Sequence, residues 1–117
     1  MNKMTIKTMS SKQSTIDFIL DQIQGAGEVR ARKMFGEYAL YCDDKVVALV
    51  CDDQLFVKIT DAGKKFVGKN YKEGKAYPSA KPSMLIDEEL IENREWLWDL
   101  VRITADALPM VKVKRKN

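Results

Sequence analysis

Two pairs of adjacent aspartates, at positions 43–44 and 52–53, are the residues whose type and spacing first suggest chemistry. Neighbouring carboxylates can bind a divalent cation or act together in acid–base catalysis. Each pair, however, interrupts an apolar run, and aspartate is favoured in tight turns because its short side chain tolerates a left-handed backbone. Turns at opposite ends of one strand would hold the four carboxylates apart. We therefore interpret both pairs as hairpin turns and predict no metal site.

Other groups that catalysis commonly uses are missing from the sequence. The chain contains no histidine, which removes the most frequent general base and every nucleophile–histidine pair. The two cysteines, Cys42 and Cys51, end successive predicted strands, so we expect them about 16 Å apart and reduced. Glu37 is the one acid among apolar strand residues, and we expect it to be exposed on the outer face. No catalytic residue, cofactor or enzymatic activity is predicted.

A lysine-rich segment is the clearest candidate for binding an anionic partner. Six lysines and one acid, Glu73, occur between positions 64 and 81. The candidate contacts to phosphate or nucleic acid are Lys64, Lys65, Lys69, Tyr71, Lys72, Lys75, Tyr77 and Lys81. The lysines could meet phosphates while the two tyrosines stack on bases. Two plainer interpretations stay open: a solvated surface, or a loop that folds against the acidic segment 87–95.

Length and composition indicate one soluble globular domain. The chain has 117 residues, of which 45% are hydrophobic and 32% charged, and its formal net charge is +3. Mean hydropathy is -0.33, and no apolar run approaches the roughly 18 residues that a membrane helix needs. The polar first residues lack the apolar stretch of a signal peptide. We therefore expect a cytoplasmic protein with no membrane partner.

Hydrophobic periodicity predicts a helix near the start of the chain. The apolar residues at the i, i+3, i+4 and i+7 spacing of one helical face are Ile16, Ile19, Leu20 and Ile23. Ser10 and Gln13 have the spacing of a capping box. A short helix is marginal by itself, so this face must pack on something. We expect it to pack on the sheet face that carries Leu40, Leu49 and Val57.

The most regular segment, residues 38–59, predicts a three-stranded antiparallel meander. Tyr38, Leu40 and Cys42 share one face of an extended chain, while the central run "VVALVC" is apolar on both faces. The breaks at the aspartate pairs are too short for a crossover but suit tight hairpins. We interpret the preceding "VRARKM" as a continuation of the first strand.

The remaining sequence predicts a short helix, two short strands and a long final helix. Thr60 can cap a helix over residues 61–67, and a strand is expected around residues 84–86. Asn93 can cap the last helix, on which Trp98 projects away from the apolar stripe and should be only partly buried. The predicted fold class is α+β, with a two-layer arrangement of an antiparallel sheet and packed helices in the order α-β(3)-α-β(2)-α.

Several blocks of the sequence resemble the TfoX/Sxy N-terminal domain family. They are "RKMFGEYALY", the later "DDQLFVK" with a Thr-capped helix, "YPSAKPSMLI" and the terminal "WLWDLVRITADALP". The resemblance implies a domain over residues 12–110, with an N-terminal tail at 1–11 and a basic C-terminal tail at 111–117. It also implies a two-layer fold of the same order as that expected above. Longer family members carry a second, C-terminal helical domain, and we expect this chain to be a single-domain member.

The resemblance implies a regulator more than an enzyme, because longer members regulate natural competence with a transcription activator. Our leading hypothesis is a non-enzymatic module that binds a protein partner, in transcription or competence regulation. One alternative is weak nucleic-acid binding through the 64–81 lysines. The other is a small-ligand protein or an enzyme with a pocket under residues 34–38.

Overall fold

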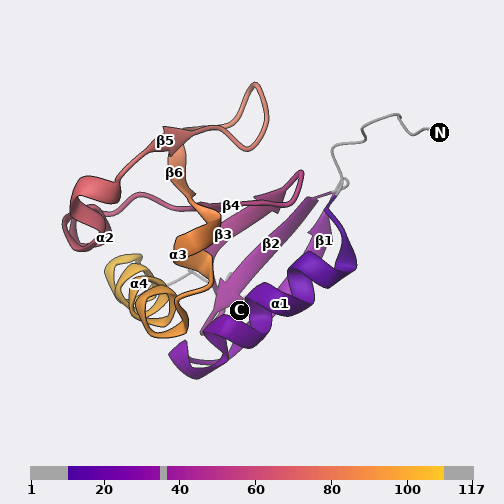
Figure 1. Cartoon of the computed structure of the whole chain (residues 1–117), viewed down its shortest axis with the longest axis horizontal. Helices are drawn as coiled ribbons and strands as arrows, with labels where there is room; N and C mark the ends of the chain where they lie inside the picture. The colour runs from indigo at the N-terminus through magenta and orange to yellow at the C-terminus, as the bar shows by residue number, and fades with distance from the viewer. Residues whose placement is uncertain (1–10, 35–36, 110–117) are drawn as a thin grey trace, which may run out of the picture.

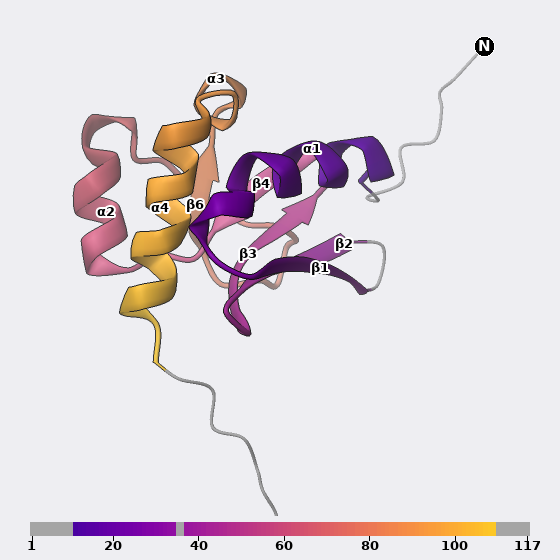
Figure 2. The same ribbon diagram turned by 90° about the horizontal axis from the view of Figure 1, so that it is seen from below.

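The computed structural model describes residues 11–34 and 37–109 and contains one six-stranded antiparallel sheet. The strands, β1 (Val29–Met34), β2 (Glu37–Cys42), β3 (Lys45–Cys51), β4 (Gln54–Val57), β5 (Glu73–Gly74) and β6 (Ser83–Ile86), lie in the order β1-β2-β3-β4-β6-β5. The α-helices are α1 (Gln13–Ile23), α2 (Asp61–Val67), α3 (Glu88–Ile91) and α4 (Arg94–Ala107). Figures 1 and 2 show α1 and α4 on one side of the sheet, with α2 beside α4. The predicted α+β class is confirmed.

The residues Val29–Met34, expected to continue the first strand, form a separate strand. β1 runs antiparallel to β2, with Val29 opposite Cys42 and Met34 opposite Glu37. The meander therefore has four strands where three were expected. The short helix α3 between β6 and α4 is a second addition to the expected order.

Both aspartate pairs occupy two-residue hairpin turns, as expected. The pair at 43–44 joins β2 to β3, and the pair at 52–53 joins β3 to β4. All four aspartates have positive φ angles, between 52° and 68°. Two consecutive left-handed residues give a turn whose twist matches that of the flanking strands. The aspartates are therefore explained by backbone conformation.

The main core lies between the sheet and the helices. Ile16, Ile19 and Ile23 of α1 are buried there against residues that include Leu40 and Val57. Leu49 was expected in this group, but it packs on the opposite face of the sheet. There it joins a smaller cluster of Cys51, Phe56, Ala76 and Leu85.

An irregularity in β3 accompanies the different placement of Leu49. Leu40 pairs with Ala48 and Tyr41 with Val46, so Val47 is an extra residue in the ladder. Val47 and Ala48 are both buried in the main core. Because a bulge breaks the strict alternation of side chains, the two faces of β3 cannot be assigned by counting from one end.

The starts of α1, α2 and α4 are fixed in two different ways. The Thr60 Oγ1 accepts a hydrogen bond from the Gly63 N–H at 2.9 Å, and the Asn93 Oδ1 accepts one from the Trp96 N–H at 3.2 Å, so both predicted caps are confirmed. α1 instead begins after Lys12, which provides no side-chain cap. Ser10, the expected cap, lies outside the described residues.

The turn between β3 and β4 fixes the start of α1. The Lys12 N–H donates to the Asp53 Oδ1 at 2.8 Å, and the Asp53 N–H donates to the Ser11 Oγ at 2.9 Å.

Trp98, expected to be partly buried, keeps 38% of its area exposed. Its ring covers Gly25, where an added Cβ would lie only 2.5 Å from the Trp98 Cζ2.

None of the helices in the described ranges has the length and apolar character needed to cross a membrane. The expected tails were residues 1–11 and 111–117; apart from Ser11, both lie outside the described residues.

Candidate functional site

The candidate lysines lie on several different elements. Lys64 and Lys65 are in the last turn of α2, and Lys69 follows in a 3₁₀ turn (Gly68–Asn70). Lys72 and Lys75 flank the two-residue strand β5, and Lys81 lies in the loop between β5 and β6. All six are exposed. Figure 1 shows that this loop extends away from α2, so the lysines at the two ends of the segment are separated in space.

Two of the eight candidate residues contact each other. The Lys64 Nζ lies 4.8 Å from the centre of the Tyr71 ring, in a cation–π contact. The Tyr71 hydroxyl donates to the Glu73 carboxylate at 2.7 Å, and this hydrogen bond raises the pKa of the phenol. One face of the ring is therefore occupied by the protein's own ammonium group, which leaves it less suited to stack on a base.

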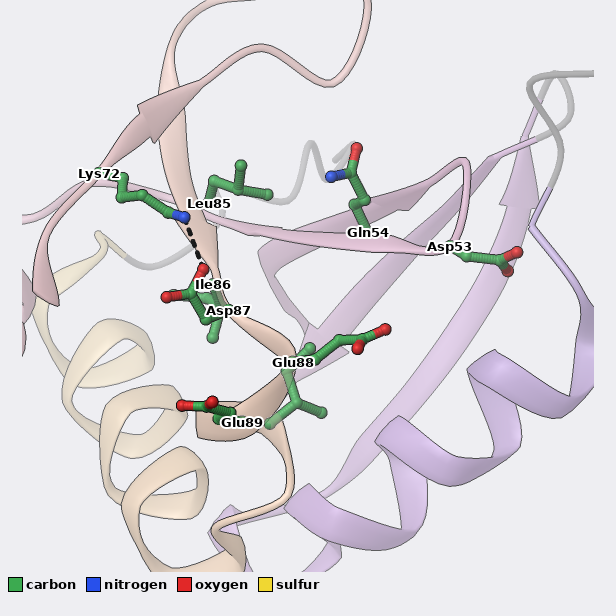
Figure 3. A pocket seen from close by; sticks show the side chains of 9 residues that line it. Asp53, Gln54, Lys72, Leu85, Ile86, Asp87, Glu88 and Glu89 are labelled. Carbon is green, nitrogen blue, oxygen red and sulfur yellow. Dashed lines mark hydrogen bonds and ion pairs between the residues drawn. The ribbon is translucent and has the colours of Figure 1, made fainter.

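Lys72 forms an ion pair with Asp87, which belongs to the acidic segment 87–95 against which the lysine loop was considered to fold. Its Nζ lies 2.5 Å from the Asp87 Oδ1, at the edge of a depression of about 450 Å³ (Figure 3). The other charged residues that line this depression are Asp53, Glu88 and Glu89. An opening with four carboxylates and one neutralised lysine repels phosphate. No group of three or more potential ligands within the described ranges is arranged to hold a metal ion.

Tyr77 and Lys81 lie over the sheet face that the helices leave uncovered. They line a depression of about 540 Å³ together with Leu49 and Phe56 of the smaller cluster. Tyr77 is 39% exposed. The depression is thus formed by the β5–β6 loop together with β3 and β4. Lys65, Lys69 and Lys75, in contrast, make no hydrogen bond or ion pair with the described part of the chain. Whether any of the eight residues binds an anion stays a prediction.

The two thiols are buried on opposite faces of the sheet and do not form a disulfide. Burial raises the pKa of Cys42 and of Cys51, and neighbouring acids add to both shifts. The Cys42 Sγ lies 3.8 Å from the Ala26 carbonyl oxygen, to which it donates. Because the thiolate is the reactive form, neither cysteine has the environment of a nucleophile.

Glu37 differs from its expected exposure. It is half-buried, and its Oε1 is fully enclosed with no hydrogen-bond partner in the described structure. This burial raises the pKa of the carboxyl group. A proposed pocket under residues 34–38 stays a prediction, since positions 35 and 36 lie outside the described residues.

Comparison with known proteins gives the family. The family model of the TfoX N-terminal domain matches residues 21–108 of this chain. The chain belongs to the TfoX N-terminal domain family. It is also 41% identical over 107 residues to a protein of Spirochaeta aurantia named as an uncharacterized 12.7 kDa protein in the trpE 5′ region. That match covers 92% of this chain and 91% of the relative.

The TfoX N-terminal match spans the last turn of α1, from residue 21 on, the whole sheet and α4. The family is linked in general to the regulation of competence, and its members are generally non-enzymatic. The matched region therefore contains every surface described above, and the family supplies no catalytic residue to place on them.

The sequence analysis expected residues 29–34 to continue the first strand, but it missed that they form a separate, cationic strand at the edge of this TfoX N-terminal fold. Arg30, Arg32 and Lys33 of β1 are all exposed. Arg30 lies over the Tyr41 ring at 4.0 Å and forms an ion pair with Asp44 at 3.5 Å. The available signal was the "VRARK" pattern itself, in which cations alternate with small apolar residues as they do on protected edge strands.

Proposed function

We propose that this chain is a non-enzymatic regulatory module that binds a protein partner in the control of competence or transcription. Membership of the TfoX N-terminal domain family is the observation that carries the proposal. A cytoplasmic location belongs to the same proposal, because competence regulators act where genes are transcribed.

The chemistry of the described residues supports binding over catalysis. The sequence has no histidine, and burial raises the pKa of both thiols. The carboxylates around the depression of Figure 3 line an open acidic surface without an enclosed acid–base pair. Glu37 is the one side-chain carboxyl group whose pKa is raised overall, and no second acid is bonded to it among the described residues. A general acid–base site needs such a positioned second group.

Weak nucleic-acid binding is the second candidate, supported by the exposed cations of the 64–81 segment. Two contacts and one acidic depression reduce its support. Lys72 is neutralised by Asp87, Lys64 covers Tyr71, and the acidic opening lies directly beside Lys72. The helices of the described fold do not form a helix-turn-helix, the motif that commonly places a recognition helix in the major groove of DNA.

The proposal is tested by affinity capture from extracts of the native host. The full chain carries a C-terminal tag, and each capture is done with and without nuclease before proteins and DNA are identified. We expect one or a few host proteins to be retained in both conditions. A matched control is the Leu97→Asp variant, in which a fully buried core position carries a charge and the fold should be lost. Retention of DNA alone would overturn the proposal.

A further inference from the structure

The strand β1 is a border of the sheet with unpaired backbone groups. Within residues 11–34 and 37–109 it has a hydrogen-bonded neighbour on one side only, β2, and Figure 2 shows it at the rim of the sheet. The Asp43 N–H donates to the Glu28 carbonyl at 2.9 Å, which sets the alternation of the β1–β2 ladder. By that alternation the backbone N–H and C=O groups of Val29, Ala31 and Lys33 point away from β2. They form a template for one more strand.

Two arginines lie on the face of β1 that points away from the helices. Arg30 and Arg32 lie opposite Tyr41 and Ala39 of β2, so their side chains share the sheet face that the helices leave uncovered. Arg30 is already held in place by the Tyr41 ring and by an exposed ion pair with Asp44. Arg32 makes no ion pair within the described ranges, and the residue is exposed.

On its helix side, β1 borders a groove that is partly apolar. A depression of about 470 Å³ lies between α1 and β1 and is lined by Leu20, Val29 and Gly27, with Asp17, Asp21 and Gln24 at its rim. Leu20 and Val29 are half-buried, so apolar surface remains open in the groove. A strand added to β1 would place alternate side chains in this groove and on the arginine face.

We propose that β1 docks an extended segment of a partner protein in which acidic and apolar residues alternate. The acidic residues meet Arg30 and Arg32, and the apolar residues enter the groove beside Leu20 and Val29. The segment's backbone completes the hydrogen bonds of Val29, Ala31 and Lys33, in the strand-addition mode of peptide recognition. This inference rests on the proposed function, for which it names the docking surface and the chemistry of the partner.

Two occupants from the chain itself fit poorly. A second copy that pairs β1 with β1 in antiparallel fashion would bring the arginines of both copies onto one face, and like charges across a sheet are destabilising. The segments 1–10 and 110–117 contain lysines or arginine and no acid, so neither complements the border. Charge complementarity therefore selects a partner that is acidic.

Nucleic acid fits the border less well than an acidic protein. Phosphates would be attracted by Arg30 and Arg32, but they cannot use the outward N–H and C=O groups as a paired ladder. Asp17 and Asp21 at the rim of the groove would repel a second row of phosphates. DNA binding is accordingly an outcome that the test must be able to show.

The test measures binding of a fluorescein-labelled peptide that alternates glutamate with valine over about eight residues, a common strand length. The full chain is compared with the Arg30→Glu/Arg32→Glu variant. A matched control, Lys65→Glu/Lys69→Glu, makes the same change in charge on α2 and the turn after it. We expect the β1 variant to bind at least about tenfold more weakly at low salt and the control to bind as the parent does. Circular dichroism melts verify that each variant is folded.

Two further measurements separate strand addition from simple charge attraction. A peptide of the same composition with its glutamates contiguous should bind more weakly, since it cannot present two distinct faces. Hydrogen exchange of the amides of Val29, Ala31 and Lys33 should slow in the complex, whereas exchange at Arg30 and Arg32, already paired with β2, should change little. Equal binding of both peptides, or unchanged exchange at all five amides, overturns the proposal.

Two other outcomes also count against it. Tighter binding of duplex DNA than of the peptide, lost in the β1 variant, would reassign the border to nucleic acid. If the host protein captured by the parent chain is retained equally by the Arg30→Glu/Arg32→Glu variant, the partner docks elsewhere. In that case the proposed function stands while the inference about β1 fails.

Discussion

The Arg102 guanidinium on α4 donates to the Asp43 carboxylate at 3.0 Å, in the turn between β2 and β3. The same guanidinium donates to the Ala26 carbonyl at 2.6 Å and to the Asp106 carboxylate at 2.7 Å. The second oxygen of Asp43 accepts the backbone N–H of Glu28 at 2.9 Å. One arginine thus joins the last helix to the segment before β1 and to the hairpin between β2 and β3.

The first prediction concerns the acid sensitivity of this junction. The Glu28 N–H and then the Arg102 guanidinium lower the pKa of Asp43 from its ordinary value of 3.8. A lowered carboxyl pKa stabilises the fold above 3.8, and that contribution is lost as the pH falls through the folded-state pKa. Asp43→Asn should lower Tm at neutral pH and show a smaller loss of Tm on acidification, as followed by circular dichroism.

Two arginine variants control this prediction. Arg102→Met should lower Tm at neutral pH, because three hydrogen-bond acceptors lose their donor. Arg94→Met removes an exposed pair with Asp21 at 3.1 Å, and such pairs contribute roughly 0–1 kcal/mol. An equal fall in Tm for both variants would show that the Arg102 junction contributes no more to stability than an exposed ion pair does.

The second prediction grades three neighbouring positions of α1. Ile19 is 2% exposed, so Ile19→Ala should reduce the free energy of unfolding by about 2–5 kcal/mol. Leu20 is half-buried and Leu20→Ala should cost about 1–2 kcal/mol. Phe18 is 45% exposed, and Phe18→Ala should stay within about 0.5 kcal/mol of the parent chain. Urea denaturation measures all three, and a larger cost at Phe18 than at Ile19 would contradict the packing of α1.

The third prediction concerns the half-buried Glu37 carboxyl group, of which one oxygen is enclosed. Burial raises its pKa above the ordinary 4.5, so the folded state holds the proton more tightly than the unfolded state does. The stability of the fold therefore decreases as the pH rises from 4.5 through the folded-state pKa. Glu37→Gln should raise Tm at neutral pH and give no gain below that window. The exposed Glu89→Gln is the control, and a gain of equal size there would contradict the assignment to burial.

The fourth prediction concerns the lysines of the 64–81 segment. We expect duplex DNA to bind weakly even at low ionic strength, and Lys72→Glu and Lys75→Glu to change that binding little. A phosphate-binding surface would instead give a log–log slope against salt of about -0.9 for each phosphate neutralised. Fluorescence anisotropy over a salt series measures the slope. Tight binding whose slope is flattened by reversing both charges would make nucleic-acid binding the leading function.

Elements with a strong local signal could be predicted from the sequence. The apolar stripe of α1, the caps at Thr60 and Asn93 and the aspartate turns each depend on a few neighbouring residues. The separate strand β1 was not recognised, because its cations disguise the alternation of an edge strand and no Asn-Gly type of turn signal precedes β2. Leu49 was assigned to the wrong face because β3 is apolar on both faces and contains a bulge.

The candidate surfaces were harder to predict than the fold. The pairing of Lys72 with Asp87 depends on how β5 and β6 align, and that segment has only a weak strand signal among its glycines and prolines. The groove between α1 and β1 depends on a strand that had not been recognised. Surfaces arise where elements distant in sequence meet, so a residue pattern names their members only after the topology is known.

The central claim is that this chain regulates by binding a protein directly. The most direct measurement is sedimentation velocity of the purified chain mixed with the purified host protein recovered by capture, both treated with nuclease. We predict a stable complex that sediments faster than either component and keeps a fixed stoichiometry as the concentrations are varied. Two independently sedimenting components, with a joint species formed only when DNA is added back, would contradict the claim.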